Sequence, residues 1–428
     1  MKKMKRLLII SYYWPPTGGS GVQRWVKFAK YLPQLGWQPV IYTPLNPERL
    51  AYDESLLKDI PAGTEILRTP ISEPYDLYRK LFGKKGSQQE VNPLNSRGNS
   101  MKARLARWLR GNLFIPDPRV SWVRPSLRYL KKYLREHPVD AVVTTGPPQS
   151  MHLIGLGLKR SLGLKWVADF RDPWTKMFYY KHLSLSALAD RRHRALEQSV
   201  LDEADAVIAV SPPVRDDFAA ATSTPVHLIT NGFDPDDFPP HGAQESPDES
   251  LLTIVHTGLF AADGNPLKLW EALSERCRSD ALFASRLRIR LCGKTDREVT
   301  DSIRACGLGE NLVDLGYLPH EQVVQEQRRA SILILPLRRE PEYAKVLPGK
   351  IFEYLASGRP VLGIGDEDGA AATVLRDSGS GVMYGWDEKE RLMEFIDKPC
   401  RPTGNIDQYT RSGLTERLVA LLENLIEK

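Results

Sequence analysis

The stretch Leu347-Pro-Gly-Lys-Ile-Phe-Glu-Tyr-Leu-Ala-Ser-Gly-Arg-Pro-Val-Leu-Gly363 predicts a turn, a short amphipathic helix from Lys350 to Ser357, and a buried strand begun by Pro360. A helix N-terminus that opens with Gly and Lys concentrates free backbone N–H groups and positive charge, which favours a diphosphate. Glu353 follows Lys350 by three residues on the same helix face, within reach of the ribose hydroxyls. The segment therefore predicts a nucleotide-diphosphate site.

The same segment resembles the donor-sugar signature of the GT-B glycosyltransferases, in particular the large retaining, family-4-like group. In that group, a strand-turn-helix element ending in Glu-Tyr-Leu-Ala-Ser-Gly-Arg-Pro-Val holds a nucleotide sugar. The resemblance implies that Gly349, Lys350 and Glu353 bind the donor. It also implies an α/β fold of two Rossmann-like doubly wound domains with a ligand cleft between them. The alternative is an ordinary helix-strand unit of any doubly wound domain.

Length and composition favour a two-domain cytoplasmic protein. A chain of 428 residues is too long for one ordinary core and predicts two domains of about 200 residues. The four cysteines form no Cys-x-x-Cys pair, which is typical of reduced thiols. The apolar run Leu7–Ile10 behind the basic N-terminus is too short for a signal peptide, and no apolar run approaches the length of a membrane span.

The charge is divided unevenly along the chain. Residues 1–200 carry 34 Lys and Arg against 15 Asp and Glu, a formal charge of +19, and the remainder carries −13. The most basic part runs from Arg79 to Arg135. Such asymmetry indicates anionic partners. An anionic membrane surface is one candidate, and nucleic acid is not expected because no recognised nucleic-acid module is present.

Two blocks of alternating strand and helix patterns predict two parallel sheets with helices on both faces. We expect an acceptor-binding domain at 1–240 and a nucleotide-sugar-binding domain at 246–405, joined by the Pro- and acid-rich His241–Glu249. In the resembled family, a terminal helix such as the one expected at 406–428 crosses back onto the first domain. Residues 84–100 are expected to form an exposed loop. Ligands should bind at the carboxyl ends of the strands.

The segment Ser11-Tyr-Tyr-Trp-Pro-Pro-Thr-Gly-Gly-Ser-Gly21 follows the first strand and leads into a helix. Glycines let a backbone approach a ligand closely, and a helix start favours anions. The spacing is not GxGxxG, so a dinucleotide cofactor is poorly supported. The resembled family has a similar loop near the acceptor and the donor phosphates, which makes Gly18, Gly19, Ser20 and Gly21 candidate binding residues. A turn that needs glycine for close packing is the alternative.

The block Val167-Ala-Asp-Phe-Arg-Asp-Pro-Trp174 places charges at the end of a buried strand, where they are out of place unless they serve a site. This block and Thr144–His152 are similar to blocks of a glycosyltransferase subgroup. The resemblance implies that Asp172 or Asp169 orients an acceptor hydroxyl and that Arg171 meets an anionic acceptor. An Asp–Arg pair that only pins the loop is the alternative.

Two other strand ends, at Gly258 and at Lys294, should face the donor. The chain also departs from the common family pattern, because Lys345 stands eight residues before Glu353, where a second Glu usually contacts the donor sugar. Phosphate charge is therefore expected from Lys350, Lys345, Lys294 or Arg338. The departure leaves the identity of the sugar and the stereochemical outcome open.

No cofactor and no metal are expected beside the nucleotide-diphosphate sugar, which is a substrate. The sequence has no HxxxH or HxxE cluster, and it lacks GxSxG, P-loop and kinase motifs. GT-B enzymes hold the diphosphate with helix dipoles and cations, which is consistent with this expectation.

The basic stretch Met101–Ile115 alternates cations with Leu, Trp and Phe at helical spacing. Such a helix can lie in a membrane interface with its arginines reaching the headgroups. It can equally pack on the first domain through its apolar stripe, and the sequence leaves both interpretations open.

These patterns together predict a hexosyltransferase-like enzyme that moves a sugar from a nucleotide-diphosphate sugar to a glycan or lipid-linked acceptor. Its pathway would be cell-surface polysaccharide biosynthesis, at the inner face of the cytoplasmic membrane. Catalysis would rest on stabilising the leaving diphosphate as the domains close. Two alternatives stay open: a GT-B nucleotide-sugar epimerase and a non-catalytic binding or scaffold protein.

Overall fold

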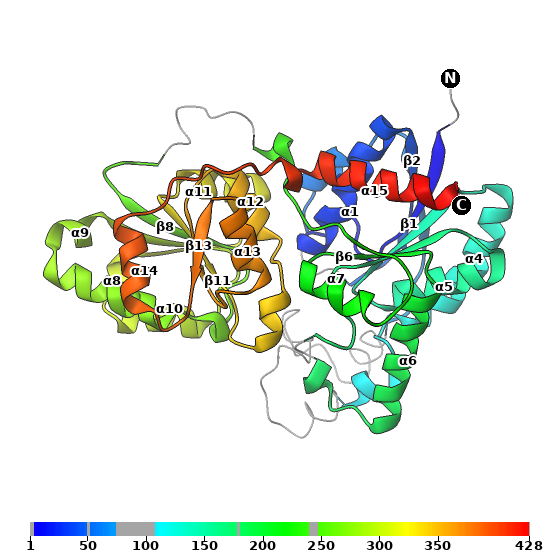
Figure 1. Cartoon of the computed structure of the whole chain (residues 1–428), viewed down its shortest axis with the longest axis horizontal. Helices are drawn as coiled ribbons and strands as arrows, with labels where there is room; N and C mark the ends of the chain where they lie inside the picture. The colour runs from blue at the N-terminus through cyan, green and yellow to red at the C-terminus, as the bar shows by residue number, and fades with distance from the viewer. Residues whose placement is uncertain (1–3, 49–51, 74–107, 178–179, 239–246, 428) are drawn as a thin grey trace. The chain divides into compact units, whose positions relative to one another are not determined.

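The computed structural model describes residues 4–48, 52–73, 108–177, 180–238 and 247–427. The chain divides into two compact units, Met1–Ile229 with Thr415–Lys428 and Thr230–Leu414. Each unit is built on one parallel sheet with helices packed against it (Figure 1). The predicted fold class, two Rossmann-like doubly wound domains, is confirmed. The loop expected at 84–100 and most of the expected linker lie outside the described residues.

The sheet of the first unit has seven strands in the order β3-β2-β1-β4-β5-β6-β7. Its strands are β1 (Lys5–Ile10), β2 (Trp37–Pro44), β3 (Glu65–Thr69), β4 (Ala141–Gly146), β5 (Trp166–Phe170), β6 (Ala206–Ala209) and β7 (Val226–Leu228). The order reverses between β1 and β4, which are paired in parallel. In open α/β sheets this reversal opens a crevice at the carboxyl ends of the strands, where ligands bind.

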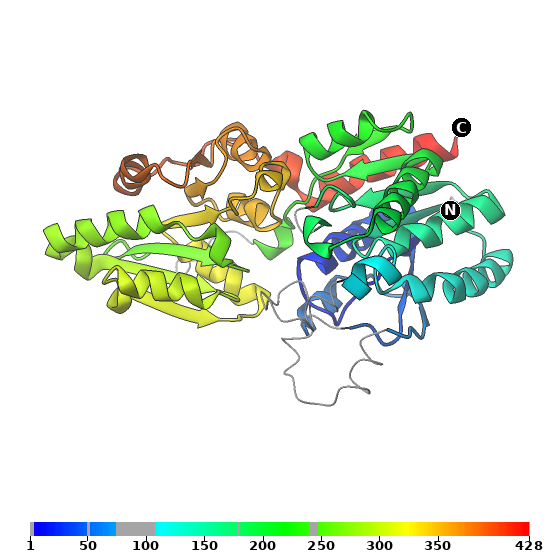
Figure 2. The same cartoon turned by 90° about the horizontal axis from the view of Figure 1, so that it is seen from below.

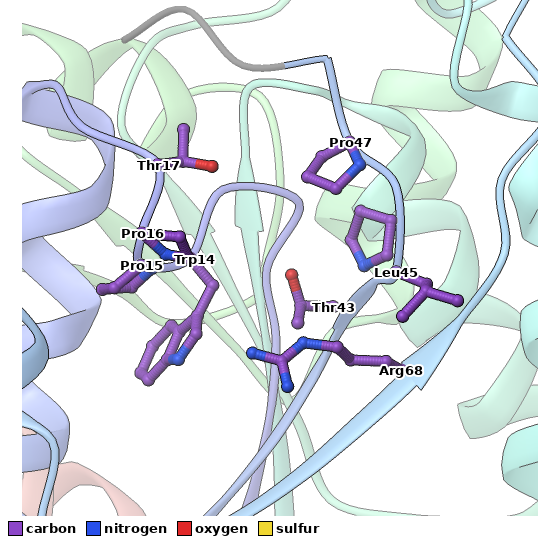
Figure 3. A pocket seen from close by; sticks show the side chains of 9 residues that line it. Trp14, Pro15, Pro16, Thr17, Thr43, Leu45, Pro47 and Arg68 are labelled. Atoms are coloured by element: carbon purple, nitrogen blue, oxygen red, sulfur yellow. The ribbon is translucent and has the colours of Figure 1, made fainter. Parts of the chain in front are cut away.

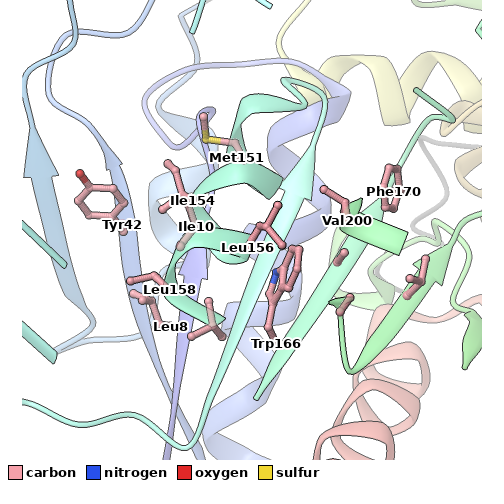
Figure 4. Close-up of a cluster of buried hydrophobic side chains, with 14 of the residues drawn as sticks. Leu8, Ile10, Tyr42, Met151, Ile154, Leu156, Leu158, Trp166, Phe170 and Val200 are labelled. Atoms are coloured by element: carbon pink, nitrogen blue, oxygen red, sulfur yellow. The ribbon is translucent and has the colours of Figure 1, made fainter. Parts of the chain in front are cut away.

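The core of the first unit lies between this sheet and the helices on its faces (Figures 1 and 2). Its helices are α1 (Ser20–Tyr31), α4 (Val120–Glu136), α5 (Ser150–Leu162), α6 (Ala187–Glu203), α7 (Pro212–Ala219) and α15 (Arg411–Ile426). Figure 4 shows side chains of α5 packed over the strands, with Trp166 and Phe170 of β5 in the same cluster. The strands read as continuous apolar runs because both of their faces are covered.

Two helix boundaries differ from the sequence prediction. The helix expected over 23–35 ends at Tyr31 and continues as a 3₁₀ turn, because Pro33 has no N–H to donate to the preceding turn. The helix expected to begin at Pro125 starts at Val120. The burial of Trp122 accounts for the earlier start, since its ring stacks on Tyr42 at 4.8 Å and adds apolar burial to the first turn.

The C-terminal segment from Thr415 groups with the first unit (Figure 1). Glu423 of α15 accepts hydrogen bonds from Trp37 Nε1 at 2.8 Å and from Lys5 Nζ. Both donors lie at the starts of strands, and so the C-terminal part of the helix is fixed to the edge opposite the carboxyl ends.

The second unit has a six-stranded sheet in the order β10-β9-β8-β11-β12-β13. Its strands are β8 (Leu252–Thr257), β9 (Leu287–Cys292), β10 (Leu312–Gly316), β11 (Ile332–Pro336), β12 (Val361–Ile364) and β13 (Gly381–Tyr384). Its helices are α8 (Leu267–Ser279), α9 (Ala281–Arg286), α10 (Arg297–Ala305), α11 (His320–Arg329), α12 (Lys350–Ala356), α13 (Ala370–Asp377) and α14 (Lys389–Asp397). The reversal lies between β8 and β11. Within the described ranges, no helix combines the length and the apolar character that a membrane span requires.

Candidate functional site

The two reversals of strand order hold most of the residues that the sequence singled out. In the first unit, the loops after β1 and β4 meet around Arg171, which directly follows β5. Its Nη1 donates to the carbonyl oxygen of Gly21 at 3.1 Å, and its Nη2 donates to the carbonyl oxygen of Pro147. A Cβ atom on Gly21 would lie 2.5 Å from Nη1. This glycine is therefore needed for a close approach that ties the two loops together.

Asp169 is the fully buried anchor of this region. Its carboxylate pairs with Arg24 (Nη2–Oδ1 2.8 Å), and neither side chain is exposed. Trp25 Nε1 and Thr145 Oγ1 donate to Oδ2 at 2.7 and 2.9 Å. Burial alone would raise the pKa of Asp169, but the charge of Arg24 and these hydrogen bonds hold it below its usual range. A fully buried carboxylate held by these donors positions α1 and β4 and is out of reach of a substrate.

Asp172 differs from Asp169 although it lies only three residues further on. It is half-buried, and among the described residues its carboxylate has no hydrogen-bond or ion-pair partner. Burial raises the pKa of Asp172, while the charge of Arg171 partly offsets this effect. An unpaired carboxylate with a raised pKa at the carboxyl end of a strand is the group of this unit best suited to accept a hydrogen bond from a bound hydroxyl.

Buried polar atoms without partners gather next to Arg171. Both amide atoms of Gln149, His152 Nε2 and Arg171 Nε are buried and have no hydrogen-bond partner among the residues that the structure describes. A Cβ atom on Gly146 would lie 2.5 Å from Gln149 Oε1 and 2.6 Å from His152 Nε2, so both atoms line the end of β4. Burial lowers the pKa of His152 to about 3, and the imidazole is neutral. Such orphaned atoms in a native fold indicate a place where a ligand supplies the partners.

The glycine loop after β1 is only partly explained by packing. Gly18 is buried, whereas Gly19 is exposed and has a φ of 111°, a conformation that favours glycine. Gly19 precedes α1 and makes no side-chain cap, and a Cβ atom there would meet open space. Ser20 is the first residue of α1, and its side chain lies outside the described parts. Gly21 is the member of the loop that contacts another candidate residue.

In the second unit, Lys350 lies at the reversal between β8 and β11. Its Nζ is 2.8 Å from Nε2 of His256 in β8 and donates to the carbonyl oxygen of Leu259 at 3.3 Å. Burial lowers the pKa of Lys350 to about 7, although the charge of Glu353 opposes this shift. Burial and the Lys350 charge lower the pKa of His256 well below its ordinary value. The neutral imidazole therefore accepts from the ammonium, and its Nδ1 is buried without a partner in the described ranges.

Glu353 lies one turn further along α12 and is held by α11. His320 Nε2 is 3.3 Å from Oε1, and Gln327 Nε2 donates to Oε2 at 3.2 Å. Burial would raise the pKa of Glu353, but the hydrogen bonds and charge of His320, the Gln327 bond and the charge of Arg411 lower it. The side chain keeps 16% of its surface exposed. It is thus an ionised acceptor that is oriented by its neighbours and still reachable.

Glycines shape the carboxyl edge of the second sheet. Gly258 has a φ of 84°, and a Cβ atom there would lie 3.5 Å from Lys350 Cε and Nζ. Gly293 has a φ of 125°, and its Cβ atom would lie 2.5 Å from the carbonyl oxygen of Gly258. The strand ends of β8 and β9 therefore pass each other more closely than any side chain would allow. This contact brings the end of β8 against Lys350.

The other predicted donor residues lie near the same edge without joining this contact. Gly349 precedes α12 with open space around it. Lys294 is exposed and has no side-chain contact among the described residues, and Lys345 is exposed at the end of a 3₁₀ turn. Arg338 pairs with Asp263 at 3.0 Å. The structure thus places Lys350 and Glu353 on one helix with Gly258 against Lys350. Lys294 and Lys345 lie outside this group.

Sequence reasoning missed four of the groups that hold this site, Arg24, Gln149, His320 and Gln327. Gln149 lies in the segment Thr144–His152 that the sequence analysis singled out, so its position after a strand was a usable signal. The other three carry no local signal because tertiary packing brings them to their partners. Over the described ranges, no group of three or more His, Cys, Asp or Glu side chains could hold a metal ion. Metal independence stays a prediction.

Comparison with known proteins gives two family matches. The model of Glycosyltransferase Family 4 matches residues 19–237, and that of Glycosyl transferases group 1 matches residues 252–398. No curated protein matches the chain by sequence.

Solved structures show the same fold over almost the full length of the chain. One similar structure is sucrose-phosphate synthase from Thermosynechococcus elongatus (TM-score 0.60, 14% identity, 99% of this chain and 96% of that chain). Another is WaaG, a glycosyltransferase involved in lipopolysaccharide biosynthesis (0.57, 14%, 97% and 99%). A third is a putative UDP-N-acetylglucosamine 2-epimerase from Listeria monocytogenes (0.57, 12%, 99% and 97%). At these identities, the likeness shows the fold alone.

Proposed function

The chain belongs to glycosyltransferase family 4, and on this premise we propose that it transfers a sugar from a nucleotide-diphosphate donor to a glycan or lipid-linked acceptor. One observation carries the proposal. A cation and an oriented carboxylate, Lys350 and Glu353, stand one turn apart on α12, at the reversal of strand order in the second sheet. A nucleoside diphosphate offers the complementary pair, since its phosphates accept from a cation and its ribose hydroxyls donate to a carboxylate.

The donor's diphosphate would bind Lys350, with Gly258 and Gly349 leaving room for its oxygens. The neutral His256 supports this role, because it fixes the ammonium without neutralising its charge. Glu353 would accept from the ribose, in an orientation set by His320 and Gln327. Lys294, which is exposed after β9, would meet a second phosphate or the sugar.

The acceptor would bind the first unit at the crevice between β1 and β4. Asp172 is the group that would receive the hydrogen bond of the acceptor hydroxyl, because its carboxylate has no partner among the described residues. Arg171 and Asp169 act as positioning residues, since their polar atoms hold the loops after β1 and β4 and the start of α1. The orphaned atoms of Gln149 and His152 supply further donors and acceptors for a polar ligand.

The rate enhancement would come from Lys350 and neighbouring cations as charge builds up on the departing diphosphate. The protonated Lys350 offers a positive charge that is partly removed from water, where electrostatic stabilisation is stronger. This account requires no metal ion, and the second Glu that the family pattern places at position 345 is replaced by Lys345.

A membrane-bound acceptor in cell-surface polysaccharide assembly fits the charge of the first unit. Residues 108–113 are helical, and Trp108, Leu109 and Leu113 are exposed by 43, 36 and 63%. Apolar side chains on a basic surface favour the interface of an anionic bilayer. Co-sedimentation with anionic and neutral vesicles tests this part: the proposal requires binding to the anionic vesicles, weakened by Trp108→Ser with Leu113→Ser.

A thermal-shift panel with UDP, GDP, dTDP, CDP and their common sugars tests the donor site. We expect one nucleotide diphosphate to stabilise the protein selectively, and Lys350→Ala or Glu353→Ala to abolish the shift. Lys398→Ala and Glu390→Ala are matched controls, because both residues are exposed in the same unit and have no side-chain contact among the described residues. The absence of any shift in a folded protein would contradict the proposal and favour a binding protein that has lost the chemistry.

A further inference from the structure

A pocket lies in the first unit, beside the crevice between β1 and β4. It has a volume of about 270 Å³ and is formed by the loops after β1 and β2 and by the end of β3 (Figure 3). Its walls include Trp14, Pro16, Thr17, Thr43 and Arg68. None of these residues belongs to the candidate donor or acceptor groups described above.

The pocket presents hydrogen-bond donors that lack an acceptor. Trp14 and Thr17 are 3% and 1% exposed, and within the described part of the chain neither Trp14 Nε1 nor Thr17 Oγ1 has a hydrogen-bond partner. Arg68 is exposed, and its guanidinium makes no ion pair or hydrogen bond with another described residue. Figure 3 shows the Arg68 guanidinium reaching from β3 toward Trp14. Buried N–H and O–H groups are normally paired, so this set indicates a ligand that brings oxygen acceptors.

The remaining walls of the pocket define the kind of molecule that carries these oxygens. The rings of Pro16 and Pro47, which are only partly buried, give flat apolar surfaces. Thr43 Oγ1 donates to the carbonyl oxygen of Tyr12 at 3.3 Å and so keeps its lone pairs for an incoming hydroxyl. The volume is below the roughly 300–1,000 Å³ of pockets for drug-sized ligands. A single ring with C–H faces and hydroxyl groups fits this description.

We propose that this pocket binds one sugar residue that carries an anionic group, as part of the acceptor glycan. The anion pairs with Arg68, whose planar guanidinium matches a carboxylate or a phosphate in bidentate geometry. One anion oxygen also accepts from Trp14 Nε1, and the sugar face packs on the rings of Pro16 and Pro47. The charge of +19 on residues 1–200 attracts anionic glycans to this unit. The role as an acceptor subsite rests on the proposed function, whereas binding of the sugar does not.

The test is a calorimetric titration of the full chain, without nucleotide, using four probes. These are methyl glucuronide, methyl glucoside as its neutral counterpart, glucose 6-phosphate, and acetate as a free anion. We expect methyl glucuronide or glucose 6-phosphate to bind at least about 10-fold more tightly than methyl glucoside. Whichever of the two binds more tightly identifies the anion as a carboxylate or a phosphate.

Variants separate this pocket from general charge attraction. Arg68→Ala should weaken binding of the anionic sugar at least about 10-fold, and Trp14→Phe, which keeps an aromatic ring but removes the N–H, about fivefold. Arg135→Ala is the matched control, because Arg135 is an exposed arginine in the last turn of α4 and it should leave binding unchanged. Equal losses in Arg68→Ala and Arg135→Ala, equal affinity for methyl glucoside, acetate binding as tight as the sugar, or no binding would each overturn the proposal.

Failure of the pocket and failure of the proposed function give different results. The titration needs no nucleotide sugar, so Arg68-dependent binding without any sugar transfer would sustain the pocket and contradict the function. Transfer to a neutral acceptor, without Arg68-dependent binding, would sustain the function and contradict the pocket.

Discussion

Asp169, in β5, and Asp172, just after β5, should respond in opposite ways to the same substitution. Asp169→Asn leaves the Arg24 guanidinium, which is not exposed at all, without its counter-charge. Breaking a buried ion pair in this way costs about 3–5 kcal/mol of unfolding free energy. Asp172→Asn removes a carboxylate that has no partner among the described residues, and its unfolding free energy should stay within about 1 kcal/mol of the wild type.

The unfolding free energies of the two variants should also change differently with pH. The pKa of Asp169 is lowered in the folded state, so its stabilising contribution is complete at neutral pH and is lost as the pH falls through the folded pKa. The deficit of Asp169→Asn should therefore be constant around neutral pH and shrink in acid. The pKa of Asp172 is raised, so its ionisation disfavours the folded state as the pH rises. At neutral pH, Asp172→Asn should be neutral or slightly stabilising.

Urea unfolding followed by tryptophan fluorescence measures this difference in the relevant unit. All tryptophans except Trp270 and Trp386 lie in the first unit, so the signal reports chiefly on it. Transfer assays should show the reverse order, with Asp172→Asn lowering kcat/KM at least about 10-fold through the lost charged hydrogen bond. The reasoning is refuted if Asp169→Asn unfolds like the wild type, or if Asp172→Asn costs as much stability as Asp169→Asn.

Three further predictions concern the second unit. Gly293→Ala should lose about 3 kcal/mol or more of unfolding free energy, because strain at a positive φ adds to a clash with Gly258. Gly316→Ala should lose only about 1 kcal/mol, because its φ is 60° but a Cβ atom there meets open space. Similar denaturation midpoints for the two variants would contradict this difference. Calorimetry should show nucleotide-diphosphate affinity falling as the pH rises through about 7, where Lys350 loses its proton, and Lys350→Arg should remove that dependence; a flat wild-type profile would argue against Lys350 as the phosphate ligand. Sugar transfer should keep its rate after dialysis against EDTA, and a loss that Mg²⁺ or Mn²⁺ restores would disprove metal independence.

The sheets were largely predictable from the sequence, because buried parallel strands appear as apolar runs separated by helical patterns. The four-residue edge strand β13 was not predicted, since its alternate residues are only half-buried and give no continuous run. The helices α13 and α14 on either side of it were missed with it. Helix ends differ from the prediction where packing overrides local preference. The burial of Trp122, for example, lets α4 begin at Val120 and not at Pro125.

The candidate site was predictable at strand ends and at the start of one helix. Asp169, Asp172 and Gly258 follow from the rule that ligands bind at the carboxyl edge of such sheets, and Lys350 and Glu353 follow from the helix that begins at Lys350. The roles of the two aspartates did not follow, because the partner of Asp169 is Arg24, 145 residues away in α1. Tertiary packing alone distinguishes the paired carboxylate from the unpaired one.

Mass spectrometry of a reaction containing the nucleotide sugar chosen by the thermal-shift panel and short glycan or lipid-linked acceptors asks directly whether sugar is transferred. We expect an acceptor product heavier by one sugar residue, release of an equal amount of nucleoside diphosphate, and loss of both with Glu353→Ala but not with Glu390→Ala. A nucleotide sugar that returns isomerised without any acceptor product would identify an epimerase. Bound nucleotide sugar that stays intact with every acceptor would identify a binding protein, and either result would contradict the account.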